Sequence, residues 1–99
     1  MLVSQTKEAR RYFVSGIVQG VGFRFFVRHV AAELELTGFT RNLRDGRVEV
    51  YVIGLPGELA RMQSLLERGP RLSSVTGVQM EAAPLDARYE NRFEIEEDD

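Results

Sequence analysis

The spacing of hydrophobic residues changes several times along the chain, and each change marks a new element of secondary structure. Residues 10–18 are rich in aromatic and β-branched side chains, a composition typical of a strand. From Arg24 the spacing becomes helical, and we expect this helix to end at Gly38. Its apolar stripe consists of Phe26, Val27, Val30, Ala31 and Leu34.

The middle of the chain predicts a hairpin. Residues 39–43 form its first strand, and residues 47–53 form its second strand, in which valines at alternate positions share one face. Asp45 and Gly46 lie between the strands, and this pair favours a tight primed turn with positive φ angles. We therefore expect these two strands to be antiparallel neighbours in a sheet.

A second helix and two further strands complete the pattern. Pro56 is suited to the first turn of a helix, and Gly69-Pro70 is a stop signal. The apolar stripe of this helix consists of Leu55, Leu59, Met62 and Leu66. We expect Gly77 to mark a β-bulge in the following strand. The last segments are that strand over residues 75–83, a polar loop over residues 84–91 and a short edge strand over residues 93–95.

Strands and helices follow one another as strand, helix, strand, strand, helix, strand, and each helix is apolar on one face. This order predicts an α+β fold, the ferredoxin-like βαββαβ two-layer sandwich, with two helices on one face of an antiparallel sheet. A right-handed crossover makes the first two strands run in the same direction. We therefore expect residues 19–24, 42–46 and 69–72 to meet at one edge of the sheet.

Length and composition narrow the class of protein. The 99 residues predict one domain over residues 10–95, with a flexible N-terminal tail (residues 1–9) and a solvated acidic C-terminal tail (residues 96–99). The chain has no cysteine, which excludes disulfides and thiolate metal sites. A net charge of −2 gives no general attraction to nucleic acid or anionic membranes. Because neither a secretory signal nor a membrane-spanning run is present, we expect a cytoplasmic monomer.

The segment from Gln19 to Arg24 has the features of an anion-binding loop. It joins a predicted strand to a helix N-terminus, where unpaired N–H groups and a partial positive charge attract anions. Gly20 and Gly22 allow the backbone to form a concave nest of N–H groups. The same residues also fit a simple tight turn with Arg24 in solvent. The loop lacks the Lys-Ser/Thr ending of nucleotide-binding P-loops.

Two longer motifs resemble the signatures of a known family. Residues 16–24, Gly-Ile-Val-Gln-Gly-Val-Gly-Phe-Arg, are similar to the phosphate-binding signature of the acylphosphatase family. Residues 38–42, Gly-Phe-Thr-Arg-Asn, and residues 45–49, Asp-Gly-Arg-Val-Glu, resemble its second signature. The resemblance covers residues 10–95. Phe39-Thr40 departs from the Trp-Val usual in the family, but the aromatic and β-branched characters are kept.

The resemblance implies an enzyme that hydrolyses acyl phosphates, the mixed anhydrides of carboxylic and phosphoric acid, to carboxylate and inorganic phosphate. It implies that Arg24 clamps the phosphate and that Asn42 orients the attacking water, with no metal, no cofactor and no covalent phosphoenzyme. The phosphate-binding residues are then Gln19, Gly20, Val21, Gly22, Phe23 and Arg24, and inorganic phosphate or sulfate is an expected ligand of the site. Taken alone, Asn42 also fits a turn residue of the hairpin.

Two other functions fit parts of the sequence. One is a non-enzymatic or carbamoyl-phosphate-handling module, similar to the N-terminal domain of the hydrogenase maturation carbamoyltransferases. In those domains the arginine is followed by Pro-Phe, whereas Phe25-Phe26 follows Arg24 here. The other is a nucleic-acid-binding sheet, which would expose aromatic residues such as Phe13 and Tyr51 for base stacking. The acidic net charge disfavours it, and we expect no nucleic-acid or membrane partner.

Two basic residues near the loop are expected to have no part in catalysis. His29, the only histidine, lies just off the apolar stripe of the first helix, where partly exposed packing is usual. Arg28 lies one helical turn beyond Arg24 and fits a solvated helix face; the alternative is that it adds positive field to the site without contacting the substrate.

Overall fold

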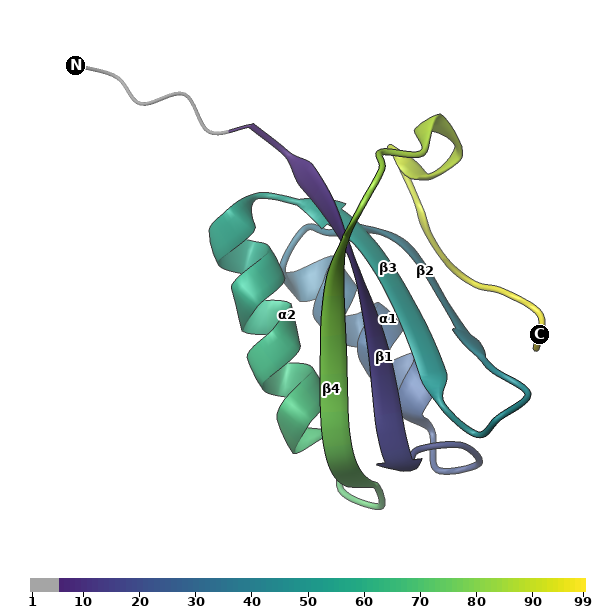
Figure 1. The fold of residues 1–99 in the computed structure, drawn as a ribbon. Coiled ribbons are helices and arrows are strands. Elements are labelled where there is room, and N and C mark those ends of the chain that lie inside the picture. The colour runs from purple at the N-terminus through teal and green to yellow at the C-terminus, as the bar shows by residue number, and fades with distance from the viewer. Residues whose placement is uncertain (1–5) are drawn as a thin grey trace.

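Five strands form one sheet in the order β4-β1-β3-β2-β5 in the computed structural model, which describes residues 6–99 (Figure 1). Neighbouring strands are antiparallel except β2 and β5, which are parallel. Both helices cover one face, so the expected ferredoxin-like sandwich is confirmed. The elements are β1 (Glu8–Ile17), α1 (Phe23–Glu33), β2 (Thr37–Asn42), β3 (Val48–Gly54), α2 (Pro56–Arg68), β4 (Ser74–Ala83), the 3-10 helix η1 (Ala87–Tyr89) and β5 (Phe93–Ile95).

The main core lies between the sheet and the two helices. Val48, Val50 and Val52 share the helix-facing side of β3 and are fully buried, as the alternation of this strand predicts. The α1 and α2 stripes close over them, and the hydroxyl of Tyr12 donates a hydrogen bond of 2.7 Å to the carbonyl oxygen of Leu59 in α2. Because a buried hydroxyl needs such a partner, this bond fixes the position of α2 over β1.

The first strand begins before the predicted boundary. Glu8 and Ala9 pair with Gly54 and Ile53 of β3, and Ala9 is buried. These two residues of the predicted N-terminal tail therefore belong to the sheet. Residues 1–5 of that tail lie outside the described residues.

Helix α1 ends at Glu33 rather than at Gly38. The chain turns at Glu35, which has a φ of 57°, and the backbone N–H of Leu36 donates to the carbonyl oxygen of Ala31. This six-to-one bond closes the helix one turn earlier than the glycine predicts. Gly38 instead lies within β2, where an added Cβ would approach the carbonyl oxygen of Tyr51 to 1.8 Å. The glycine is required by a close approach between two strands.

The β2–β3 hairpin has a three-residue loop in place of the predicted two-residue primed turn. The N–H of Gly46 donates to the carbonyl oxygen of Leu43, and Gly46 has a φ of 98°. Asp45 does not take a positive φ, so the loop is a type I turn followed by a left-handed glycine. The Asp45 carboxylate accepts a bond from the backbone N–H of Arg47, which lowers its pKa. Asp45 and Gly46 therefore form the hairpin turn at the predicted place, but not with the predicted geometry of a two-residue primed turn.

The second face of the sheet carries a smaller core beneath the segment that follows β4. Tyr51 and Tyr89 are buried there, with Phe39 stacked against Tyr51 at a centroid distance of 5.4 Å. The hydroxyl of Tyr51 donates to the carbonyl oxygen of Pro84 and accepts from the N–H of Asp86. The loop predicted over residues 84–91 is therefore fastened to the sheet and includes η1. No helix among residues 6–99 combines the length and apolar character of a membrane span.

Candidate active site

Three connections meet at one end of the sandwich. The loop between β1 and α1, the β2–β3 hairpin and the connection between α2 and β4 all lie at the lower end of Figure 1. Side-chain bonds join the first two, since Gln19 contacts both Leu43 and Arg47. At the third, an added Cβ on Gly69 would lie 3.4 Å from the Phe23 ring. The meeting of residues 19–24, 42–46 and 69–72 expected from the topology is therefore present.

The loop from Gln19 to Arg24 contains backbone N–H groups that have no acceptor in the described part of the protein. Val18 and Phe23 are buried and anchor its two ends, while Gly20 and Gly22 are exposed with φ angles of 74° and 78°. Within residues 6–99, no backbone N–H from Gly20 to Arg24 donates to a protein acceptor; the first bond of α1 runs from Phe26 to Gly22. Left-handed glycines followed by free N–H groups at a helix N-terminus form the type of nest that binds anions.

The start of α1 lacks the groups that usually satisfy a helix N-terminus. Gly22 is the N-cap and provides no side-chain hydrogen bond, and the first turn contains no acidic residue. Arg24 lies in this first turn with a half-buried side chain. A cation, a helix dipole and free donors therefore act on the same region, and their fields add for an anion placed there.

Asn42 is the last residue of β2 and is buried, with 8% of its surface exposed. It pairs with Val48, whose side chain points toward the helices, so Asn42 lies on the same face of the sheet as α1. Within residues 6–99, no hydrogen bond involves its carboxamide. Its carboxamide atoms are not among the fully buried polar atoms, so the group lies on the helix side of the sheet, can be reached by solvent, and has both a donor and an acceptor to offer.

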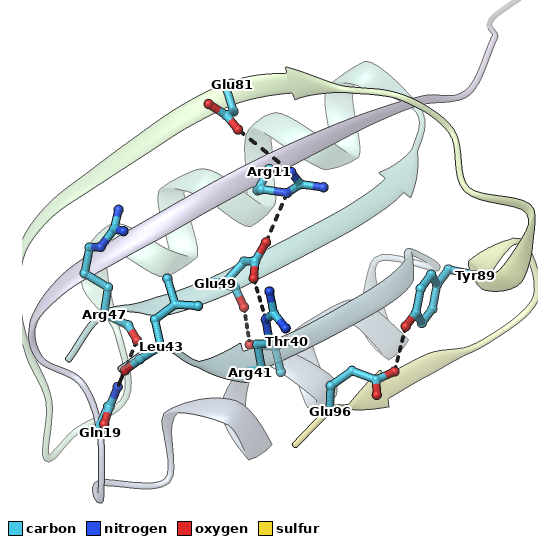
Figure 2. A network of polar contacts seen from close by, with 10 residues as sticks. All are labelled: Arg11, Gln19, Thr40, Arg41, Leu43, Arg47, Glu49, Glu81, Tyr89 and Glu96. Carbon is cyan, nitrogen blue, oxygen red and sulfur yellow. Dashed lines mark hydrogen bonds and ion pairs between the residues drawn. The ribbon is translucent and has the colours of Figure 1, made fainter. Parts of the chain in front are cut away.

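The side chain of Gln19 points to the hairpin. Its Nε2 atom donates to the carbonyl oxygens of Leu43, at 2.8 Å, and of Arg47, at 2.9 Å (Figure 2). Both amide hydrogens are therefore engaged within the protein. Only the backbone of Gln19 remains for the phosphate-binding role that the sequence predicts for this residue.

The acidic C-terminal segment lies along β2 and reaches the candidate site. The N–H of Glu96 donates to the carbonyl oxygen of Thr40, and the N–H of Asp99 donates to that of Asn42, both at 2.9 Å. Between them, Asp98 Oδ1 accepts a bond of 3.2 Å from Arg24 Nη1. The sequence predicts a solvated tail here, but the segment continues the parallel pairing of β5 with β2. Asp98 is the neighbour of Arg24 that the sequence analysis missed.

A buried carboxylate supports the site from the other face of the sheet. Glu49 accepts a 2.7 Å bond from Arg41 Nε, and Arg11 Nε lies 3.1 Å from its other oxygen without hydrogen-bond alignment (Figure 2). The hydrogen bond to Glu49 raises the pKa of Arg41. These three residues come from β1, β2 and β3. These contacts hold β1 and β3 together with β2, the strand that ends at Asn42. The alternating sequence pattern of β3 does not predict them.

The other residues that the sequence analysis considers for a function lie away from the loop at residues 19–24, or are engaged in contacts within the protein. His29 is exposed and pairs with Glu33, and Arg28 stacks over the Phe25 ring at 5.2 Å. Tyr51 is buried, so it cannot stack nucleic-acid bases. In the described part of the chain, no group of three or more His, Asp or Glu side chains could hold a metal ion.

The fold and the loop together define a class of protein, a ferredoxin-like sandwich whose first helix begins with a loop of backbone N–H groups that residues 6–99 leave unpaired. Comparison with known proteins agrees. The sequence model of the family described as Acylphosphatase matches residues 10–95. An acylphosphatase from Solibacter usitatus is 51% identical over 78 residues, which are 79% of this chain and 81% of that protein. The structure of an acylphosphatase from Coxiella burnetii superposes with a TM-score of 0.85 at 34% identity, covering 91% of this chain and 93% of the other.

The chain belongs to the acylphosphatase family, and its activity is the hydrolysis of acyl phosphates. A similar fold also occurs within a larger protein. Full-length HypF, in its phosphate- and nucleotide-bound form, superposes with a TM-score of 0.86 at 27% identity, covering 98% of this chain but 13% of HypF. The relatives that this chain matches over most of their length are the acylphosphatases.

Proposed function

We propose that hydrolysis proceeds by direct attack of water on a phosphoryl group held by Arg24 and by the backbone N–H groups of residues 19–24. No metal or cofactor takes part, and Asn42 places the water. The observation that carries this proposal is the set of unpartnered N–H groups at the start of α1, next to the half-buried Arg24. Such a set binds an anion without any change in the protonation of the protein.

The chemistry of the substrate fits a site of this kind. A water oxygen bonds to phosphorus while the bond from phosphorus to the acyl oxygen breaks, and the carboxylate leaves with the bonding electrons. Both protons of the water end on the inorganic phosphate, one on the attacking oxygen and one on another phosphate oxygen. Because a carboxylate is a good leaving group, this transfer depends on positioning and on stabilisation of charge rather than on a strong base. The N–H groups and Arg24 provide donors for the phosphoryl oxygens.

Asn42 fits the role of water ligand. A carboxamide both donates and accepts hydrogen bonds but is too weak a base to remove a proton from water at neutral pH. Its carboxamide has no partner among residues 6–99 and lies on the face of the sheet that carries α1. A water held there can be aligned with the phosphorus before reaction, which removes part of the entropic barrier.

The experiment is a phosphate-release assay with purified protein and benzoyl phosphate, with and without EDTA. We expect turnover that EDTA leaves unchanged and that Arg24→Ala nearly abolishes. A loss of turnover with EDTA that is restored by a metal ion would contradict the metal-free mechanism. Carbamoyl phosphate is the second substrate in the assay, because the sequence also fits a module that handles carbamoyl phosphate. A strong preference for carbamoyl phosphate would favour the alternative function, that of a module that handles carbamoyl phosphate.

The monomeric state and the cytoplasmic location expected from the sequence stay predictions. Gel filtration with light scattering of the purified chain tests the first. Inorganic phosphate and sulfate are proposed as ligands of the loop, with competitive inhibition as the expected behaviour.

A further inference from the structure

We infer that Gln19 is a positioning residue, which holds the phosphate-binding loop at a fixed place relative to the hairpin that carries Asn42. The inference rests on the proposed function. It concerns the Gln19 side chain, which touches neither the proposed phosphate site nor the proposed water.

The Nε2 group of Gln19 uses both of its hydrogens at the base of the hairpin loop. Its two hydrogens go to the carbonyl oxygens of Leu43 and Arg47, the residues on either side of the three-residue turn (Figure 2). Those residues are themselves paired, because the N–H of Leu43 donates to the carbonyl oxygen of Arg47 at 2.8 Å. The side chain thus binds a preformed pair of acceptors rather than a mobile loop tip.

The two parts of the proposed machinery lie on different elements. Arg24 and the N–H donors belong to the β1–α1 loop, whereas Asn42 ends β2, immediately before Leu43. Within residues 6–99, the two bonds of Gln19 are the side-chain hydrogen bonds that join the loop to the hairpin. Loss of these two bonds would leave the N–H groups of the loop and the Asn42 side chain unchanged. The loop could then shift relative to Asn42.

This separation predicts a specific kinetic signature. Phosphate binding uses backbone groups of the loop together with Arg24, so it should not depend on the side chain of Gln19. Turnover requires the water at Asn42 to lie in line with the phosphorus, and a displacement of about 1 Å can lower a rate up to roughly 100-fold. Gln19 should therefore act on kcat and not on the inhibition constant of inorganic phosphate.

The test is a double-mutant cycle between Gln19→Met and Asn42→Ala, assayed with benzoyl phosphate. Gln19→Met has a similar length and removes both donors without adding a charge beside the proposed anion site. We expect kcat to fall roughly 10- to 100-fold, with less than a twofold change in phosphate inhibition. In the Asn42→Ala background, the same substitution should change kcat less than twofold, because a positioned water is already lost.

Two further variants separate positioning from general stability. Gln19→Glu keeps the shape but places a carboxylate against two carbonyl oxygens, and it should give the same non-additive loss of kcat if Gln19→Met does not fold; phosphate inhibition is compared in Gln19→Met, which adds no charge. Tyr12→Phe removes the buried bond to Leu59, so it should lower the melting temperature and leave kcat unchanged at the assay temperature. Full kcat in a folded Gln19→Met or Gln19→Glu, or losses that multiply with Asn42→Ala, would overturn the inference. The proposed mechanism fails separately, if Asn42→Ala alone retains full kcat.

Discussion

The Asp98 carboxylate lies 3.2 Å from the Arg24 guanidinium, an ion pair between residues 74 positions apart in the sequence. The pair exists because β5 runs parallel to β2 and the chain continues beside that strand, as the yellow segment of Figure 1 shows. One donor of Arg24, the Nη1 group, is therefore already hydrogen-bonded to a carboxylate of the protein. A substrate phosphate and Asp98 would compete for the same cation.

The first prediction concerns this competition. Asp98→Asn keeps the size of the side chain and removes its charge, so it should lower both the KM for benzoyl phosphate and the inhibition constant of phosphate. Exposed ion pairs contribute about 0.2–1 kcal/mol, which corresponds to a change of up to about fivefold. The effect should shrink as salt is added, because the pair is exposed. Steady-state kinetics at two ionic strengths measure it.

Glu97→Gln is the matched control for Asp98→Asn. Glu97 is the preceding acidic residue, and it makes no ion pair within residues 6–99. Its substitution removes the same charge from the same segment and should change KM less. A higher KM or a lower kcat in Asp98→Asn would mean that Asp98 holds Arg24 in its productive position.

Arg24 is predicted to depend on its planar fork and not on charge alone. Arg24→Lys keeps the positive charge but replaces a bidentate donor by a single ammonium group. We expect kcat/KM to fall by at least about 100-fold in Arg24→Lys, close to the loss in Arg24→Ala. Arg28→Lys is the control, because Arg28 lies over the exposed Phe25 ring and has no part in the proposed phosphate site, so activity should be kept. Near-normal activity of Arg24→Lys would show that only the charge is used.

Asn42 is predicted to contribute to turnover rather than to binding. Asn42→Ala removes the carboxamide and should lower kcat about 100- to 1,000-fold, the usual cost of losing a preorganised polar contact in a transition state. The inhibition constant of inorganic phosphate should stay within about twofold, since the N–H donors and Arg24 are unchanged. An equal loss of phosphate affinity would assign Asn42 to the phosphate itself.

The loop glycines should be sensitive to backbone conformation and not to volume. Gly22 has a φ of 78° and open space around an added Cβ, so a side chain there meets strain and no steric clash. A left-handed backbone disfavours β-branched residues by about 1–2 kcal/mol but tolerates asparagine. Gly22→Val should therefore weaken phosphate binding and turnover together in a folded protein, and Gly22→Asn should do so less. Equal effects of the two variants would show that φ at this position is unimportant.

Local backbone chemistry explains which elements could be predicted from the sequence. Pro56 is the first residue of α2 and Gly69 is its C-cap, because both preferences belong to the residue itself. Gly38 misled the prediction of α1, because its role is a close approach to Tyr51 on another strand. Such an approach depends on the register of two strands, which no local pattern contains.

The residues of the site divide in the same way, into those that the local sequence predicts and those whose place depends on contacts between distant segments. Arg24 and the loop glycines stand together in the sequence, and the motif places them at a helix N-terminus. Asp98 could not be assigned, because its place depends on the three-residue strand β5 pairing with β2. The Gln19 side chain could not be assigned either, since its acceptors are backbone carbonyl oxygens that exist only once the hairpin is formed.

The sharpest test of the proposed active site is a crystal structure with inorganic phosphate bound. We expect a phosphate on the N–H groups of the loop from Gly20 to Arg24, in contact with the Arg24 guanidinium, and a water bound to the Asn42 carboxamide. A phosphate bound elsewhere on the protein, or loop N–H groups turned away from it, would show that the proposed site is wrong.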